Sequence, residues 1–135
     1  MKTSLAFSLL FSIYVHVHSQ EIDSIDLIFK ECIDSSYGST YDYINCLGDA
    51  LTAWDSELNI IYKKIISKLS ESEAEKFRAA QRKWIEYRDA EIIFIEQFYD
   101  REGKGWQVEA SAREVELTKQ RVLELRYYYS LIYDE

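Results

Sequence analysis

Acidic side chains are the most abundant chemically active groups in this chain. Asp and Glu together number 24, against 16 Lys and Arg and two His. Two carboxyl groups held about 5 Å apart in a cleft can hydrolyse a glycosidic bond. Here, however, acidic residues such as Glu71, Glu75 and Glu86 fall on the polar faces of helical patterns. This placement favours a solvated surface over a catalytic pair of carboxylates.

Side chains for nucleophilic or metal-dependent catalysis are scarce. The two histidines are His16 and His18, and both lie in an N-terminal segment that we expect to be removed. A Ser or Cys nucleophile normally needs a general base, and a di-iron bundle needs Glu-x-x-His pairs, which this sequence lacks. It also lacks a glycine-rich phosphate loop. We therefore expect no enzyme activity, no cofactor and no metal site, with a Ser–Lys pair as the catalytic arrangement left open.

The N-terminal segment has the three-part pattern of a secretory signal. Lys2 provides a positive start, an apolar run covers residues 5–17, and Val17 and Ser19 fit the −3 and −1 positions of a cleavage site. A membrane anchor would need about 20 apolar residues, more than this run contains. We expect a signal peptide at residues 1–19, a single domain at 20–135, a periplasmic location and no membrane insertion of the mature form.

The mature chain is strongly acidic. Removal of Lys2 lowers the 16 basic residues to 15, against 24 acidic ones, so the net charge becomes about −9. Such a surface repels nucleic acid and anionic membranes and favours a basic protein as partner.

The two cysteines, Cys32 and Cys46, lie fourteen positions apart. An isolated pair in an oxidising compartment is expected to form a disulfide, and a loop near this size stabilises by roughly 3 kcal/mol. A redox or metal site is the alternative, but the spacing is not C-x-x-C and no histidine accompanies the pair.

Apolar residues recur at helical spacing in four segments, which predicts a helix bundle. A short helix includes residues 22–32, and the longest regular seam follows it: Leu47, Leu51, Trp54, Leu58, Ile61, Ile65 and Leu69. Ser70 and Glu73 then fit a capping box. A third helix has an expected inward stripe at Phe77, Ala80, Trp84, Tyr87, Glu91, Phe94 and Phe98. The fourth covers residues 108–133.

Loops are expected at 34–40 and 100–105, where glycines accompany polar residues. Gly48, inside the second helix, predicts a close helix contact. The predicted fold is all-α: an antiparallel bundle of three long helices plus a short N-terminal helix clipped by the disulfide.

Residues 79–90 form the most distinctive stretch. Gln81, Trp84 and Arg88 share one helix face, and Arg88 is placed to lie against the Trp84 ring. These polar groups need partners, for which Asp55, Glu57 and Asn59 are the candidates. One interpretation is a buried polar network that fixes helix register, and the other is a recognition surface.

The sequence resembles the LprI-like lysozyme-inhibitor family. The resemblance is carried by a central motif, by one segment on each side of it and by the Cys32–Cys46 pair. The central motif is Ala80, Gln81, Arg82, Trp84, Tyr87, Arg88, Asp89 and Ala90; the segment before it is Leu58, Asn59 and Tyr62, and the segment after it is Leu117, Thr118, Arg121, Glu124 and Leu125. It covers about residues 30–126. A second cysteine pair that the family often has is absent, which suggests a freer connection between the third and fourth helices.

The resemblance implies a binding protein that inhibits a peptidoglycan hydrolase by non-covalent occlusion. The partner would be a lysozyme or another cell-wall hydrolase, and an immunity protein against a cell-wall-targeting toxin would work in the same way. An envelope structural or assembly protein that binds through a helix face is the alternative.

The partner site is expected in the loop between the third and fourth helices, at Tyr99, Lys104 and Trp106. Glycines flank large aromatic residues there, and Tyr and Trp are enriched among binding hot spots. The competing interpretation is that Trp106 caps the bundle core.

Overall fold

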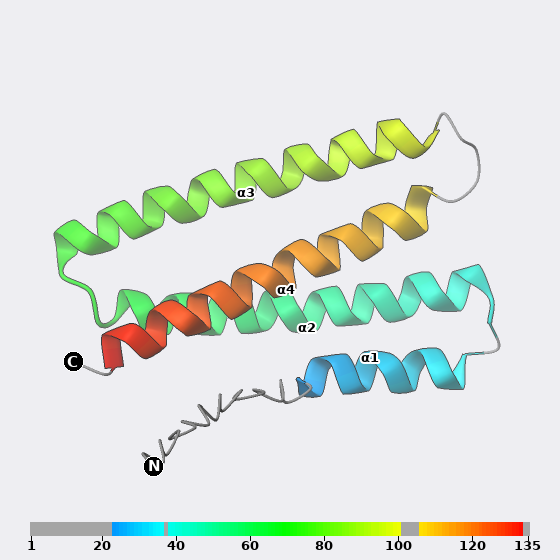
Figure 1. Cartoon of the computed structure of the whole chain (residues 1–135), viewed down its shortest axis with the longest axis horizontal. Coiled ribbons are helices and arrows are strands. Elements are labelled where there is room, and N and C mark those ends of the chain that lie inside the picture. The colour runs from blue at the N-terminus through cyan, green and yellow to red at the C-terminus, as the bar shows by residue number, and fades with distance from the viewer. Residues whose placement is uncertain (1–22, 37, 101–105, 134–135) are drawn as a thin grey trace, which may run out of the picture.

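The chain forms four helices with consecutive helices running in opposite directions (Figure 1). The computed structural model describes residues 23–36, 38–100 and 106–133, without the side chains of residues 99, 100, 106 and 133. The helices are α1 (Ser24–Ser35), α2 (Thr40–Ile66), α3 (Glu71–Asp100) and α4 (Trp106–Tyr133), and the described residues include no strand. The predicted all-α bundle is confirmed, while the predicted signal peptide lies outside the described residues.

Local hydrogen bonds explain where three of the helices begin. The Asp23 carboxylate caps α1 by accepting from the Ile25 amide at 3.0 Å, and the Ser39 hydroxyl caps α2 in the same way. Before α3, the Ser70 amide donates to the Glu73 carboxylate at 2.9 Å, which is the reach-back half of the predicted capping box. The Ser70 hydroxyl also donates to that carboxylate.

The core lies between α2 and α4, which run in the same direction and pack most extensively against each other. The predicted seam of α2 is buried along most of its length and meets an apolar face of α4. The fully enclosed cluster consists of Trp54, Leu58, Ile61, Ile65, Val122 and Leu125. The regular apolar seam therefore predicted the buried face of α2 correctly. The helix that covers this face is α4, which runs parallel to α2.

Helix α3 packs on α4 and makes far less contact with α2 (Figure 1). Its inward residues include Ala74 and Gln81, whereas Tyr87, Phe94 and Phe98 of the predicted stripe are about half exposed. The expected inward position of these three aromatic residues is therefore wrong. Because only one neighbouring helix covers α3, its buried face is narrower than its apolar stripe.

Helix α1 has no fully buried residue and is held to α2 by the Cys32–Cys46 disulfide, as predicted. The two Cα atoms lie 5.8 Å apart, within the usual range for a disulfide. The predicted close contact at Gly48 is wrong, since that residue is exposed and has open space around it. No described helix combines the length and the apolar character that crossing a bilayer requires.

Candidate functional site

A groove of about 460 Å³ lies between α2 and α3. It exists because both helices pack on α4 while they approach each other at few points, such as the stacked rings of Tyr62 and Phe77, 5.4 Å apart. Its lining combines aromatic, amide and charged side chains: Asp55, Leu58, Asn59 and Tyr62 from α2, and Arg78, Gln81, Arg82, Trp84, Ile85 and Arg88 from α3. Four residues that carry the family resemblance on α3 thus meet in one groove: Gln81, Arg82, Trp84 and Arg88.

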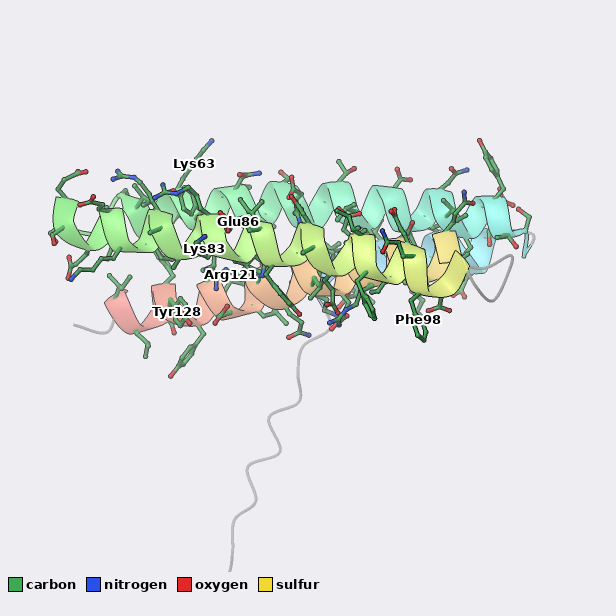
Figure 2. All side chains as sticks on the ribbon, turned by 90° about the horizontal axis from the view of Figure 1, so that it is seen from above. Lys63, Lys83, Glu86, Phe98, Arg121 and Tyr128 are labelled. Atoms are coloured by element: carbon green, nitrogen blue, oxygen red, sulfur yellow. A yellow bond between two sulfur atoms is a disulfide. The ribbon has the colours of Figure 1, made fainter. Side chains whose placement is uncertain are left out.

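Two guanidinium groups lie over the ring of Trp84. Arg88, one turn further along α3, is 5.3 Å from the ring centroid, and Arg121 of α4 is 5.8 Å from it. Arg121 lies between α3 and α4 (Figure 2) and its Nε–H donates to the Gln81 Oε1 atom at 2.9 Å. The predicted Trp84–Arg88 contact is present, and the network also reaches α4.

Arg88 reaches the carboxylate of Asp55 on α2, as predicted, with a nitrogen–oxygen distance of 3.8 Å. Its shorter contacts go to the neighbouring Asp89, at 3.1 and 3.2 Å. The other candidate partners are engaged elsewhere: the Asn59 amide donates to the Asp55 carbonyl, and Glu57 pairs with Arg126. The Arg88–Asp55 contact therefore spans the α2–α3 seam loosely.

The groove is locally cationic in an acidic protein. Arg78, Arg82 and Arg88 line it against the single carboxylate of Asp55, whereas the whole chain has a net charge of −8. Arg78 is paired with Glu71 at 3.0 Å. Arg82 has no ion-pair or hydrogen-bond partner among the described side chains. The positive electrostatic field of the three arginines and the unpaired N–H donors of Arg82 together suit the groove to an anionic group.

Glu124 completes the arrangement on the α4 side by accepting hydrogen bonds from Arg121 and from the Tyr128 hydroxyl, the latter at 2.7 Å. Burial alone would raise the pKa of Glu124, but these hydrogen bonds and the charge of Arg121 outweigh burial and lower it. The hydrogen bond to Glu124 also raises the pKa of Tyr128. Arg121 is thereby held in place beside Trp84.

A second cation–tryptophan cluster lies on the opposite side of α4. The ring of Trp54 has Lys119 and Arg126 over it, each 5.8 Å from the centroid. Lys119 pairs with Asp26 at 2.8 Å, and Arg126 pairs with Asp23 and Glu57. Acidic residues of α1 and α2 thus neutralise both cations.

Charge pairing in this second cluster shifts two pKa values. Burial would raise the pKa of Asp23, but hydrogen bonds from Arg126 and the Ile25 amide lower it on balance. Burial would likewise lower the pKa of Arg126, but its hydrogen bonds to Asp23 and Glu57 raise it. Both charged forms are therefore favoured in the folded protein, as expected for a structural cluster.

The remaining predicted site residues do not meet in the groove. Tyr87 is half exposed and Asp89 faces solvent apart from its bond to Arg88. The side chains of Tyr99, Lys104 and Trp106, the predicted partner-binding residues, lie outside the described residues. Within the described part of the chain, no three metal-ligating side chains gather at one point.

Arg78, Arg82 and Arg121 are site residues that the sequence analysis did not place in the site. For Arg121 a signal existed, because it belongs to the closing segment of the family resemblance. Its partner Gln81 is 40 residues away in sequence, so only the fold brings them together. Arg82 likewise belongs to the central motif of that resemblance, whereas for Arg78 the sequence offers only a charge on a helix.

Comparison with known proteins agrees with this architecture at the level of a family. No curated protein and no solved structure matches the chain. The profile of one family, described as lysozyme inhibitor LprI, matches residues 32–125. That span includes both cysteines, the whole groove and the buried part of α4. The match describes a family of inhibitors and not of enzymes, and the chain belongs to this LprI lysozyme-inhibitor family.

Proposed function

We propose that this protein is exported to the periplasm, where it binds a peptidoglycan hydrolase and occludes its cleft without chemistry. The observation that carries the proposal is the match to the lysozyme-inhibitor family over residues 32–125. The signal-like N-terminal segment and the disulfide support an oxidising, extracytoplasmic location. An immunity protein against a cell-wall-targeting toxin would use the same mechanism with a different hydrolase.

The charge of the chain supports a basic partner. A net charge of −8 attracts a cationic protein over long range and accelerates encounter. Salt screens such steering, so association with a basic hydrolase should slow as ionic strength rises.

An exposed apolar cluster at the C-terminal end of α3 is our proposed contact surface. Ile93, Phe94 and Phe98 are 55%, 59% and 48% exposed, and the two phenylalanine rings lie 5.8 Å apart. Phe98 projects outward from this end of α3 (Figure 2). The cluster leads directly into the segment with Tyr99 and Trp106, which the sequence analysis proposes as the partner site. Clustered aromatic side chains are the usual anchors of protein interfaces.

A lysis assay tests both the function and the surface. The mature protein should inhibit clearing of a peptidoglycan suspension by purified lysozyme or by a hydrolase encoded nearby. Replacing Phe94 and Phe98 with Ala, together with Tyr99→Ala and Trp106→Ala, should weaken inhibition about tenfold or more, the equivalent of about 1.4 kcal/mol of binding free energy.

The matched control uses Tyr127→Ala with Leu131→Ala. These residues are also four apart and exposed, but lie toward the end of α4, at the opposite end of the bundle (Figure 1). Absence of inhibition with every hydrolase tested would contradict the proposed function. If the two sets of substitutions weakened inhibition equally, the C-terminal end of α3 would not be the contact surface.

A further inference from the structure

We propose that the α2–α3 groove is a receptor for a carboxylate group. The inference concerns a different surface from the end of α3, and it does not depend on hydrolase inhibition. It rests on the charge of the groove, on the amide nitrogen of Gln81 in its wall, which has no partner among the described residues, and on the size of the cavity.

The charge of the groove selects an anion. Arg82 contributes a guanidinium group without a partner among the described side chains, and Arg78 and Arg88 add positive charge on either side of it along α3. A guanidinium fork matches the two oxygens of a carboxylate, which gives paired, charge-assisted hydrogen bonds. A cationic or wholly apolar ligand would leave this charge uncompensated.

Gln81 provides the second, independent observation. Its side chain lines the groove although the residue is only 8% exposed. The Nε–H of Arg121 is a donor, so the atom of Gln81 that faces it must be the acceptor Oε1. The Nε2 group of Gln81 therefore points elsewhere, and it has no hydrogen-bond partner among the described residues. Among the described residues, the side-chain atom that is buried without a partner is the Thr118 hydroxyl. Water therefore reaches the Gln81 Nε2 group, and a bound carboxylate oxygen can take the place of that water.

The groove also shows that a carboxylate fits. Its volume of about 460 Å³ suits a small ligand or one or two side chains of a partner. Asp55 already places one carboxylate in it, 3.8 Å from Arg88. The same Asp55 charge opposes a doubly charged phosphate more strongly than a singly charged carboxylate.

Titration of the full mature chain, labelled with nitrogen-15, tests the proposal. The first probe is an acetylated and amidated Ala-Glu-Glu-Ala peptide, with Ala-Gln-Gln-Ala as its neutral match. The second probe is sodium acetate at constant ionic strength. Saturable shifts of the Trp84 indole and Arg82 Nε–H resonances with the Glu peptide support the proposal. A parallel effect of acetate identifies the free carboxylate as sufficient, and its absence identifies a peptide-borne group.

Two charge-matched variants locate the binding. Arg82→Gln should weaken the Glu peptide about tenfold, as expected for loss of a charge-assisted contact. Lys83→Gln removes the same charge from the next residue, which is exposed, paired with Glu86 and outside the groove, so its affinity should stay at the wild-type value. Equal weakening by both variants, equal shifts with the Gln peptide, or no shift with either carboxylate probe would overturn the proposal.

Discussion

Among the described residues, two sites place a pair of cations over a tryptophan, one on each side of α4, and the two sites differ in how far other helices enclose them. Trp54 is 1% exposed, and carboxylates from α1 and α2 neutralise its two cations. Trp84 is partly exposed at the groove, and its arginines bond mainly to acidic residues of their own helices, Asp89 and Glu124.

Three helices contribute residues to each site, so the difference follows from how closely those helices approach one another. At Trp54, Asp26 of α1 and Asp23, the N-cap residue before α1, complete the enclosure that α2 and α4 begin. At Trp84, α3 packs on α4 but approaches α2 at few points, so the seam between α2 and α3 stays open. The same combination of residues is thus a structural cluster where it is closed, and a candidate binding site where it is open.

Truncation of the two tryptophans should give the largest contrast in stability. Trp54→Ala removes a fully buried ring from the core cluster and should lower the free energy of unfolding by about 3–5 kcal/mol. Trp84→Ala should cost about half as much, because its ring already touches the groove. Urea unfolding followed by circular dichroism measures both, and equal losses would refute the distinction.

Breaking the Cys32–Cys46 disulfide should disturb the cluster around Trp54 and leave the Trp84 site unchanged. Its loss should destabilise by about 3 kcal/mol in the chain-entropy estimate and should release α1, which supplies Asp23 and Asp26. We expect hydrogen exchange in α1 to accelerate first and the Trp54 indole resonance to shift. The native protein should show no titratable thiol. A comparable shift at Trp84 on reduction would mean that the two sites are coupled.

Removal of Arg88 should have a smaller effect than removal of a buried ion would. Its partner on α2, Asp55, is about half exposed, so water can replace the lost contact. We therefore expect Arg88→Ala to destabilise by about 0.5–1 kcal/mol, instead of the roughly 2–4 kcal/mol expected if a buried partner were left unpaired. Thermal melting measures the change. A loss in that larger range would show that the Arg88–Asp55 contact between α2 and α3 is shielded from water in solution.

Acid should lower the free energy of unfolding by protonating Asp23 in the cluster around Trp54. The folded-state pKa of Asp23 lies below its ordinary value of 3.8. Its stabilising contribution is therefore present above that value and is lost as the pH falls through the lowered one. Asp23→Asn should flatten the acid side of the stability–pH curve, whereas an unchanged curve would show that the Arg126 pair contributes nothing to it.

The sequence predicted those features that depend on residues close together in the chain. The seam of α2 was identified because seven apolar residues recur at spacings of three and four, and the disulfide because the chain has only two cysteines. The inward face of α3 was predicted incorrectly at Phe94 and Phe98, since apolar spacing does not show how many helices will cover a face.

The groove could not be predicted in the same way. It depends on α4 lying against both α2 and α3, and on Arg121 bonding to Gln81 across 40 residues of sequence. Neither fact is encoded in a local pattern. The family resemblance did mark Gln81, Trp84, Arg88 and Arg121, but it gave them no common position in space.

A crossed comparison of Arg82→Gln and Arg126→Gln tests most directly the claim that the open groove beside Trp84 binds a ligand while the closed cluster around Trp54 stabilises the fold. Each variant is measured for urea stability and for affinity toward the acidic peptide, at a temperature where both are folded. We predict that Arg126→Gln loses stability, because Asp23 and Glu57 are left unpaired, and keeps its affinity. Arg82→Gln should keep its stability and lose about tenfold in affinity. The opposite pattern, or two variants that behave alike in both measurements, would contradict the account.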